Sequence, residues 1–150
     1  MNTVNVRKVE IGKGIPKICV PVVGITRDDI IDAACKAKET ADLVEWRADW
    51  YEDVLDFKKT EKMMEELRET LGDIPLLFTF RTLKEGGEKE IEKSVYVKLN
   101  EMAVKTGFAD LVDAEAFTGT DEVNTIVETA HLYGVKAVSY THLTLPTIRL

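Results

Sequence analysis

The chain has 150 residues, of which 45% are hydrophobic and 31% charged, and its net charge is -7. This length suits one ordinary domain with a buried core, and the composition excludes a mainly disordered protein. The acidic balance argues against nucleic acid as a partner, because phosphate binding depends on cationic surface. No apolar run approaches the roughly 18 residues of a membrane span. Residues 1–10 lack a signal-peptide core, so we expect a cytoplasmic protein that binds no membrane.

The amino-terminal part of the chain predicts a hairpin, a strand and a helix. Residues 3–11 alternate polar and apolar side chains before a glycine-rich turn, which predicts the hairpin. Residues 17–24 form a nearly continuous apolar run, typical of a strand buried on both faces. Residues 28–40 have helical spacing, and Thr26 or Asp28 can cap that helix.

The rest of the chain repeats the order of strand and helix. Strands are predicted at 43–47, 76–80, 108–116 and 135–140, and helices at 57–71, 88–106 and 122–133. Strands and helices that alternate through short loops require parallel pairing with right-handed crossovers, so the fold class is α/β. Periodicity does not choose between an open sheet and part of an eightfold barrel. No Gly-x-Gly-x-x-Gly follows the first strand, which weakens a dinucleotide-binding version.

Charged residues gather at or just beyond the carboxyl ends of the predicted strands, where both α/β folds build their sites. They are Glu45, Arg47, Arg81, Glu85, Asp113 and Glu115. If residues 43–47 form a strand, a period of two directs Glu45, Arg47 and Asp49 to the same side. Buried unpaired charge is costly, so such a cluster indicates a paired network in a polar cavity or a solvated surface.

The residue types in this cluster suit the recognition of an anionic, oxygen-rich molecule. Arg47 and Arg81 could contact one ligand through forked hydrogen bonds, or each could make a salt bridge at a loop edge. Glu45 could act as a general acid or base, or could orient a catalytic histidine. Asp113 and Glu115 admit the same roles, or they support the site as a buried ionic network.

Other reactive residue types give weaker signals. No histidine stands at ligand spacing beside the carboxylates, so we expect no metal site. Cys19 and Cys35 lack CxxC spacing and stand among apolar or small residues, which predicts buried, reduced thiols. His142 falls at the expected mouth of the last predicted strand. Histidine is the usual proton shuttle, so His142 is a candidate catalytic residue.

Four motifs, in order along about residues 1–138, resemble type I 3-dehydroquinate dehydratase. They are Glu45-Trp46-Arg47-Ala48-Asp49, Pro75-Leu76-Leu77-Phe78-Thr79-Phe80-Arg81, Lys84-Glu85-Gly86-Gly87-Glu88 and Asp113-Ala114-Glu115-Ala116-Phe117-Thr118-Gly119. The resemblance implies an incomplete (β/α)8 barrel of about five parallel strands and four helices after the hairpin. It also implies dehydration of 3-dehydroquinate to 3-dehydroshikimate in the shikimate pathway of aromatic amino acid biosynthesis. In the family this reaction proceeds through a lysine Schiff base and uses no metal or organic cofactor. The resemblance also implies that the full-length protein is a homodimer.

The resemblance also assigns roles to residues. It implies that Glu45, Arg47 and Arg81 contact the substrate, with the arginines facing its carboxylate and hydroxyl oxygens. Glu45 resembles the carboxylate that orients the catalytic histidine, and Glu85 resembles a residue near the pocket. Pro21 stands where some members have a substrate-contacting serine. A histidine of near-neutral pKa would remove a proton beside the imine and later protonate the departing hydroxyl.

The resemblance ends after Val138. Residues 139–150 resemble translated sequencing-adapter sequence, in which case the register of His142 with the family's histidine is a coincidence. The family's lysine lies on its sixth strand, and neither Lys84 nor Lys136 stands in that place. We therefore expect an unclosed sheet with an exposed edge and an uncovered apolar face, inactive on its own, and activity in the full-length protein. The alternative is a non-catalytic binding module for a polyhydroxy carboxylate.

Overall fold

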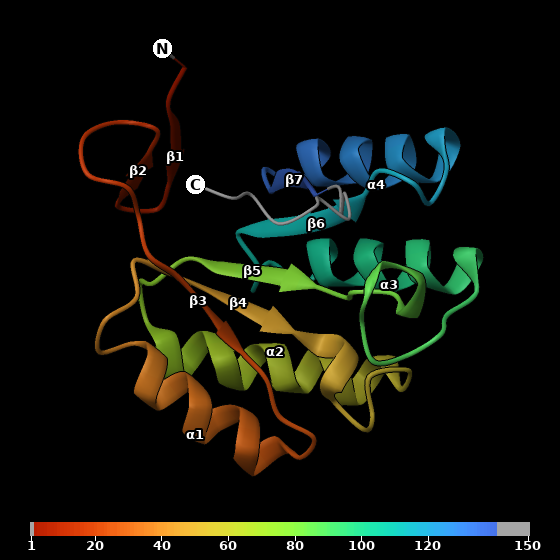
Figure 1. The fold of residues 1–150 in the computed structure, drawn as a ribbon, viewed down its shortest axis with the longest axis horizontal. Coiled ribbons are helices and arrows are strands. Elements are labelled where there is room, and N and C mark those ends of the chain that lie inside the picture. The colour runs from red at the N-terminus through yellow and green to blue at the C-terminus, as the bar shows by residue number, and fades with distance from the viewer. Residues whose placement is uncertain (1, 141–150) are drawn as a thin grey trace, which may run out of the picture.

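The computed structural model describes residues 2–140 and consists of a hairpin and a parallel sheet (Figure 1). The antiparallel hairpin is formed by β1 (Val4–Val6) and β2 (Val9–Ile11). The sheet has the spatial order β3 (Cys19–Val22), β4 (Leu43–Arg47), β5 (Leu76–Thr79), β6 (Leu111–Glu115) and β7 (Lys136–Tyr140). Its connecting helices are α1 (Arg27–Ala37), α2 (Phe57–Leu71), α3 (Lys93–Lys105) and α4 (Thr120–Leu132).

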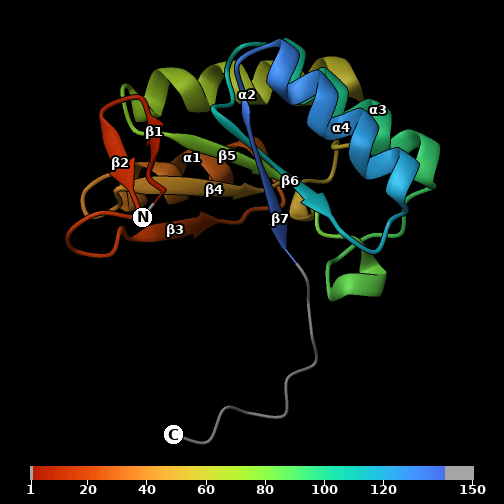
Figure 2. The same cartoon turned by 90° about the horizontal axis from the view of Figure 1, so that it is seen from above.

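The predicted α/β class, the opening hairpin and the repeated strand–helix order are confirmed. The helices lie together on one side of the curved sheet, and the hairpin lies near the beginning of the strands (Figure 2). None of the helices described is long and apolar enough to cross a membrane. β7 includes Ser139 and Tyr140, so this strand continues across the predicted boundary at residue 138. Residues 141–150, with His142, lie outside the described part of the chain.

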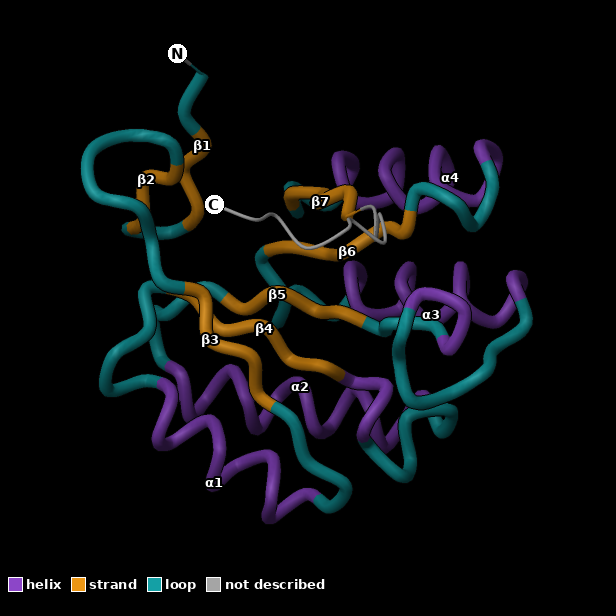
Figure 3. Tube along the Cα trace, in the orientation of Figure 1, coloured by secondary structure: helices purple, strands orange, loops and turns teal. Residues whose placement is uncertain are grey.

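The largest difference from the predicted elements is the beginning of α3, which starts at Lys93 rather than near residue 88. The preceding segment folds back on itself as a loop, the long connection between β5 and α3 in Figure 3. Thr82 pairs with Lys89 across this loop, and a short 3-10 helix, η2 (Leu83–Glu85), lies between them. Helix-favouring residues are held out of a helix here by contacts with the rest of the protein.

β3 was predicted to be buried on both faces, and this is wrong. Among the described strands β3 pairs only with β4, so it forms an edge of the sheet. Val22 is buried against the helices, whereas Cys19 and Pro21, which alternate with Val20 and Val22, are exposed. Cys19 and Cys35 were also predicted to be buried, and this is wrong, because both are free cysteines exposed on the surface.

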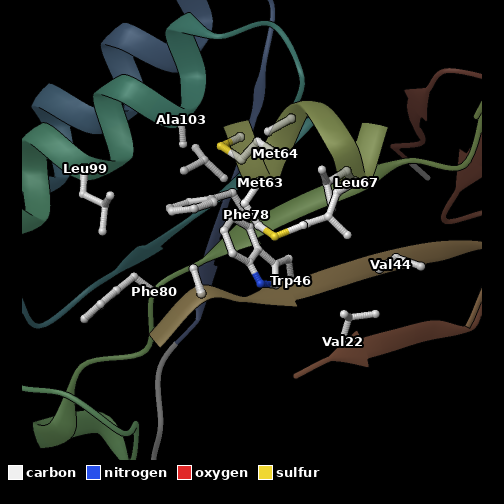
Figure 4. Packing of buried hydrophobic residues seen from close by; sticks show 14 of the residues in the cluster. Val22, Val44, Trp46, Met63, Met64, Leu67, Phe78, Phe80, Leu99 and Ala103 are labelled. Atoms are coloured by element: carbon white, nitrogen blue, oxygen red, sulfur yellow. The ribbon is translucent and has the colours of Figure 1, made fainter. Parts of the chain in front are cut away.

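The main hydrophobic core fills the space between the sheet and the helices (Figure 4). Trp46 is fully buried on the helix side of β4 and packs edge-on against Phe78, with ring centroids 5.6 Å apart. Met64 and Leu67 of α2 are also fully buried in this core. Because side chains alternate along a strand, burying Trp46 turns its neighbours Glu45 and Arg47 to the opposite face.

The opposite face of the sheet is not uniformly apolar, contrary to the expectation of an uncovered apolar face. Its apolar part is a small cluster of Leu43, Leu77 and Leu111, which are 4–8% exposed. Val6 and Ile11 of the hairpin pack against this cluster. We call this face, which points away from the helices, the inner face of the sheet. The hairpin therefore covers the apolar part of the inner face at the beginning of the strands.

An ionic network fastens the hairpin to that end of the sheet. Asp110, just before β6, accepts hydrogen bonds from Nε of Arg7 at 2.8 Å and from NH1 of Arg68 at 2.9 Å. The backbone N–H of Leu76, at the start of β5, donates to the same carboxylate at 2.9 Å. These contacts join the hairpin, α2 and two strands at the end of the sheet that is remote from the predicted site.

Candidate functional site

Polar side chains replace the leucines on the inner face toward the carboxyl ends of the strands. On each of three neighbouring strands, every second residue along this face is first apolar and then polar. These residues are Leu43, Glu45 and Arg47 from β4, Leu77, Thr79 and Arg81 from β5 and just beyond it, and Leu111, Asp113 and Glu115 from β6. The period of two along a strand therefore produces both the leucine cluster and the polar cluster from the same three strands. Hydrogen bonds and ion pairs link five of the side chains predicted at strand ends, either to one another or to a neighbouring residue: Glu45, Arg47, Arg81, Asp113 and Glu115.

Glu45 lies half-buried in the middle of this face. Thr79 on the neighbouring strand donates its hydroxyl proton to Oε2 of Glu45 at 3.0 Å. Pro21 is the residue opposite Glu45 on the other neighbouring strand, and it carries no side-chain donor. The hydrogen bond from Thr79 fixes one carboxylate oxygen of Glu45, which is suitable for a group that holds or orients a partner.

Arg81 forms the buried ionic centre of the site. The residue is 6% exposed, and its NH1 and NH2 atoms each lie 3.1 Å from a carboxylate, of Glu115 and of Asp113 respectively. Glu115 also accepts hydrogen bonds at 2.8 Å from the backbone N–H and from the hydroxyl of Thr82. Arg81, Asp113 and Glu115 therefore form a buried ionic network, which is one of the roles expected for these carboxylates.

Asp113 has a strongly perturbed ionisation. Its pKa is raised to about 7, mainly by burial and also by the negative charges of Glu115 and Glu45, while Arg81 opposes the shift. An acid with a pKa near neutrality is present in both protonation states under ordinary conditions. When Asp113 is protonated, the net charge of Arg81, Asp113 and Glu115 together is less negative, which favours the binding of an anionic ligand.

Tyr96 supports this group from α3 and was not recognised from the sequence. Its hydroxyl accepts a hydrogen bond from the backbone N–H of Glu115 at 3.0 Å and donates to the carbonyl of Asp113 at 3.4 Å. The side chain is 1% exposed, and burial raises the pKa of its phenol. The tyrosine thus ties the end of β6 to the helix behind it. An aromatic residue on an amphipathic helix is typical of a core position, so its hydrogen bonds to β6 could not be recognised from the sequence pattern.

Arg47 is held by Asp49. Nε and NH2 of Arg47 donate to the two oxygens of Asp49, both at 2.8 Å, and this pairing raises the pKa of the arginine while burial opposes it. β4 ends at Arg47, and Asp49 lies in the 3-10 helix η1 (Ala48–Trp50). The strand therefore has its predicted bounds, and Asp49 lies just beyond it rather than on it. The chain turns after Arg47 and brings the carboxylate back against the guanidinium.

The structure connects Arg47 and Arg81 through Asp49, whereas Glu85 lies on the loop that follows β5. The Asp49 carboxylate that holds Arg47 also accepts the backbone N–H of Arg81 at 3.3 Å. Glu85 lies in η2 and lines a pocket of about 410 Å³, formed by the loop after β5, the residues before and at the start of α3, and the turn after β6. Glu115 and Tyr96 also line this pocket, so it adjoins the ionic centre.

The site is built from acceptors and guanidinium groups. Within residues 2–140, no three or more His, Cys, Asp or Glu side chains come together in a way that could hold a metal ion. Two arginines of fixed orientation can bind a carboxylate or hydroxyl oxygens by charge-assisted hydrogen bonds. His142, the sequence candidate for proton transfer, falls outside the residues described.

Comparisons with known proteins agree with the resemblance. A family model for type I 3-dehydroquinase matches residues 18–149. A 3-dehydroquinate dehydratase from Clostridium botulinum is 51% identical over 140 residues, which is 93% of this chain and 55% of the relative. One from Clostridioides difficile is 43% identical over the same shares. The chain therefore spans about half the length of the curated relatives that it matches.

Solved structures give the same result. The crystal structure of type I 3-dehydroquinate dehydratase from Clostridium difficile with covalently modified comenic acid has a TM-score of 0.90 at 42% identity, covering 92% of this chain and 55% of that one. The 3-dehydroquinate dehydratase from Enterococcus faecalis has a TM-score of 0.85 at 43% identity, covering 91% and 57%. The described sheet and helices are thus arranged as in about half of each of these proteins.

Proposed function

Because the chain belongs to the type I 3-dehydroquinase family, we propose that the protein is a lyase that dehydrates 3-dehydroquinate to 3-dehydroshikimate. The observation that carries the proposal is the position of two carboxylate-held arginines at the carboxyl ends of neighbouring strands, within the region matched by the family model. We also propose that the enzyme acts in the shikimate pathway in the cytoplasm, as a homodimer and without a metal or organic cofactor.

Arg47 is suited to bind the carboxylate of the substrate. Its pairing with Asp49 uses Nε and NH2, so NH1 is the guanidinium nitrogen that this ion pair leaves for a ligand. The Arg47 side chain is 23% exposed, whereas Asp49 is fully buried, so the arginine is the accessible member of the pair. A guanidinium that is oriented before binding loses less conformational entropy when the ligand arrives.

Arg81 and Asp113 provide the second part of the proposed substrate site. Arg81 faces the hydroxyl oxygens of the substrate in this proposal, and its charge is balanced by Glu115 and by a partly protonated Asp113. A protonated Asp113 carboxyl is a hydrogen-bond donor as well as an acceptor. The group therefore offers both donors and acceptors to a polyhydroxy carboxylate.

The chemistry in this proposal proceeds through an imine. A lysine amine attacks the ketone carbon of the substrate, and the resulting carbinolamine loses water to form a protonated imine. The imine withdraws electrons, so a histidine of near-neutral pKa can take a proton from the adjacent carbon and return it to the departing hydroxyl. Hydrolysis of the imine releases the product and the lysine. Glu45, held by Thr79, is the carboxylate proposed to orient the histidine.

The proposal includes two further residues, Glu85 and His142. Glu85 is proposed to lie near the substrate because it adjoins the ionic centre through the shared pocket. His142 is proposed as the proton-transfer residue from its position in the sequence. The Clostridium difficile relative is described with covalently modified comenic acid, which supports a covalent route in this family.

Borohydride trapping tests the covalent route in the natural protein that contains this sequence. Reduction in the presence of 3-dehydroquinate should leave a substrate-derived mass on one lysine, detectable by mass spectrometry of peptides. Quinate, which lacks the ketone, is the matched control and should leave no adduct. Turnover without an adduct would contradict the imine. Calorimetric binding of quinate without any turnover would instead indicate the binding-module alternative.

A further inference from the structure

Asp49 is a fully buried carboxylate that accepts four hydrogen bonds from two different parts of the chain. Its Oδ1 accepts from Nε of Arg47 at 2.8 Å and from the backbone N–H of Arg81 at 3.3 Å. Its Oδ2 accepts from NH2 of Arg47 at 2.8 Å and from the backbone N–H of Glu88 at 3.1 Å. One carboxylate thus contacts an arginine of β4 and both ends of the loop that follows β5.

The backbone around Asp49 strengthens the same connection. Nζ of Lys89 donates to the carbonyl of Asp49 at 2.7 Å and to the carbonyl of Tyr51 at 2.9 Å. Lys89 also pairs with Thr82 at the base of the loop. The 3-10 helix η1 and the closed base of the loop are therefore fastened together by side-chain and main-chain contacts.

We propose that Asp49 is a positioning residue of the dehydratase site, which aligns Arg47 and docks the loop of residues 81–88 onto the end of β4. That loop carries Arg81 and Glu85, so one carboxylate sets the relative position of side chains from two strands. The catalytic consequence rests on the proposed function, whereas the docking of the loop does not.

The chemistry of the position explains why a carboxylate is needed there. An ionised carboxylate is acceptor-only and has enough lone pairs to serve all these donors. An asparagine of the same shape would turn an NH2 group toward at least one N–H donor and would remove the charge that balances Arg47. Asp49→Asn should therefore free the guanidinium and loosen the base of the loop without creating a cavity.

The experiment compares Asp49→Asn with Asp110→Asn in the natural protein that contains this sequence. Asp110 is a matched control because it also accepts bonds from arginine side chains and a backbone N–H, but at the far end of the sheet. Hydrogen exchange of the amides of Arg81 and Glu88 should become about tenfold faster in Asp49→Asn and stay unchanged in Asp110→Asn. Unchanged exchange in both variants would overturn the docking of the loop.

Steady-state kinetics test the alignment of Arg47. Displacing a substrate-orienting group can cost about 100-fold, so kcat/KM for 3-dehydroquinate should fall by about that factor in Asp49→Asn and stay within twofold in Asp110→Asn. When Asp49→Asn is added to the Arg47→Met variant, kcat/KM should fall by a much smaller factor, because the guanidinium that Asp49 aligns is already absent. A full 100-fold loss in that background, or no loss in the single variant, would overturn the alignment.

The outcomes separate this inference from the proposed function. If the wild-type protein turns over no 3-dehydroquinate, the proposed function fails, and hydrogen exchange still decides the docking of the loop. If Asp49→Asn does not fold, Lys89→Met takes its place, because it removes only the Nζ contacts to the carbonyls of Asp49 and Tyr51. Faster exchange at Glu88 in Lys89→Met supports the docking, and wild-type exchange there contradicts it.

Discussion

Replacing Asp113 by asparagine should change how the stability of the protein depends on pH. Asp113 is 2% exposed and contacts Arg81, and its pKa is raised by burial to about 7 from an ordinary value of 3.8. Asparagine has nearly the same shape but binds no proton in this range. Its amide also replaces an oxygen beside Arg81 with a possible donor, which adds a cost that does not vary with pH. Arg81 keeps its contact with Glu115 in the variant.

The sign and size of the pH effect follow from proton binding. Between pH 3.8 and about pH 7 the folded protein holds a proton on Asp113 that the unfolded chain has released. The free energy of unfolding therefore falls as pH rises through this range. At about 1.4 kcal/mol for each unit of pKa difference, Asp113 accounts for a loss of about 2 to 3 kcal/mol between pH 5 and pH 8. The stability of Asp113→Asn relative to wild type should rise by this amount.

Equilibrium urea unfolding of the natural protein that contains this sequence, at pH 5 and at pH 8, measures the effect. Thr60→Val is the control, because Thr60 is a buried hydroxyl that donates to the carbonyl of Val54 at 2.8 Å and does not titrate. It should lower the free energy of unfolding by about 1 kcal/mol at both pH values. A difference between Asp113→Asn and wild type that is the same at pH 5 and pH 8 would refute the reasoning.

Two further substitutions test local parts of the structure. A Cβ on Gly87 would lie 1.8 Å from the carbonyl oxygen of Arg81, so Gly87→Ala should displace the loop and lower kcat/KM by about tenfold, with unchanged circular dichroism; wild-type kinetics would contradict this. Thr26 and Asp29 form a capping box at α1, so Thr26→Ala should lower the free energy of unfolding by about 1 kcal/mol in urea. Thr125→Ala, which removes an exposed hydroxyl within α4, should cost less.

The sequence predicted elements well where local patterns and packing agree. The bounds of α2 and β4 match the prediction. The amphipathic spacing of α2 ends at Gly72, and the alternating pattern of β4 begins after a polar turn. The beginning of α3 was misplaced because Glu88 and Lys89 favour a helix locally. Their partners, Asp49 and Tyr51, lie far away in the sequence, and these contacts hold the segment in a loop.

The candidate site could be predicted in part for a similar reason. Parallel strands end at one edge of a sheet, so Glu45, Arg47 and Arg81 had to approach one another once the strands were recognised. The role of Asp49 could not be predicted, because it depends on a turn directly after Arg47. Tyr96 was missed because the backbone groups it contacts, at Asp113 and Glu115, are not visible as a sequence pattern.

The most direct test of the proposed site is steady-state dehydration of 3-dehydroquinate by the natural protein that contains this sequence, followed by ultraviolet absorbance of the conjugated product. Wild type should turn over, and Arg47→Met should lower kcat/KM by about 100-fold, since it removes an oriented donor at the substrate. Arg7→Met, which removes a carboxylate-paired arginine at the opposite end of the sheet, should leave kcat/KM within about twofold. Absence of turnover in wild type, or equal values for the two variants, would contradict the proposed site.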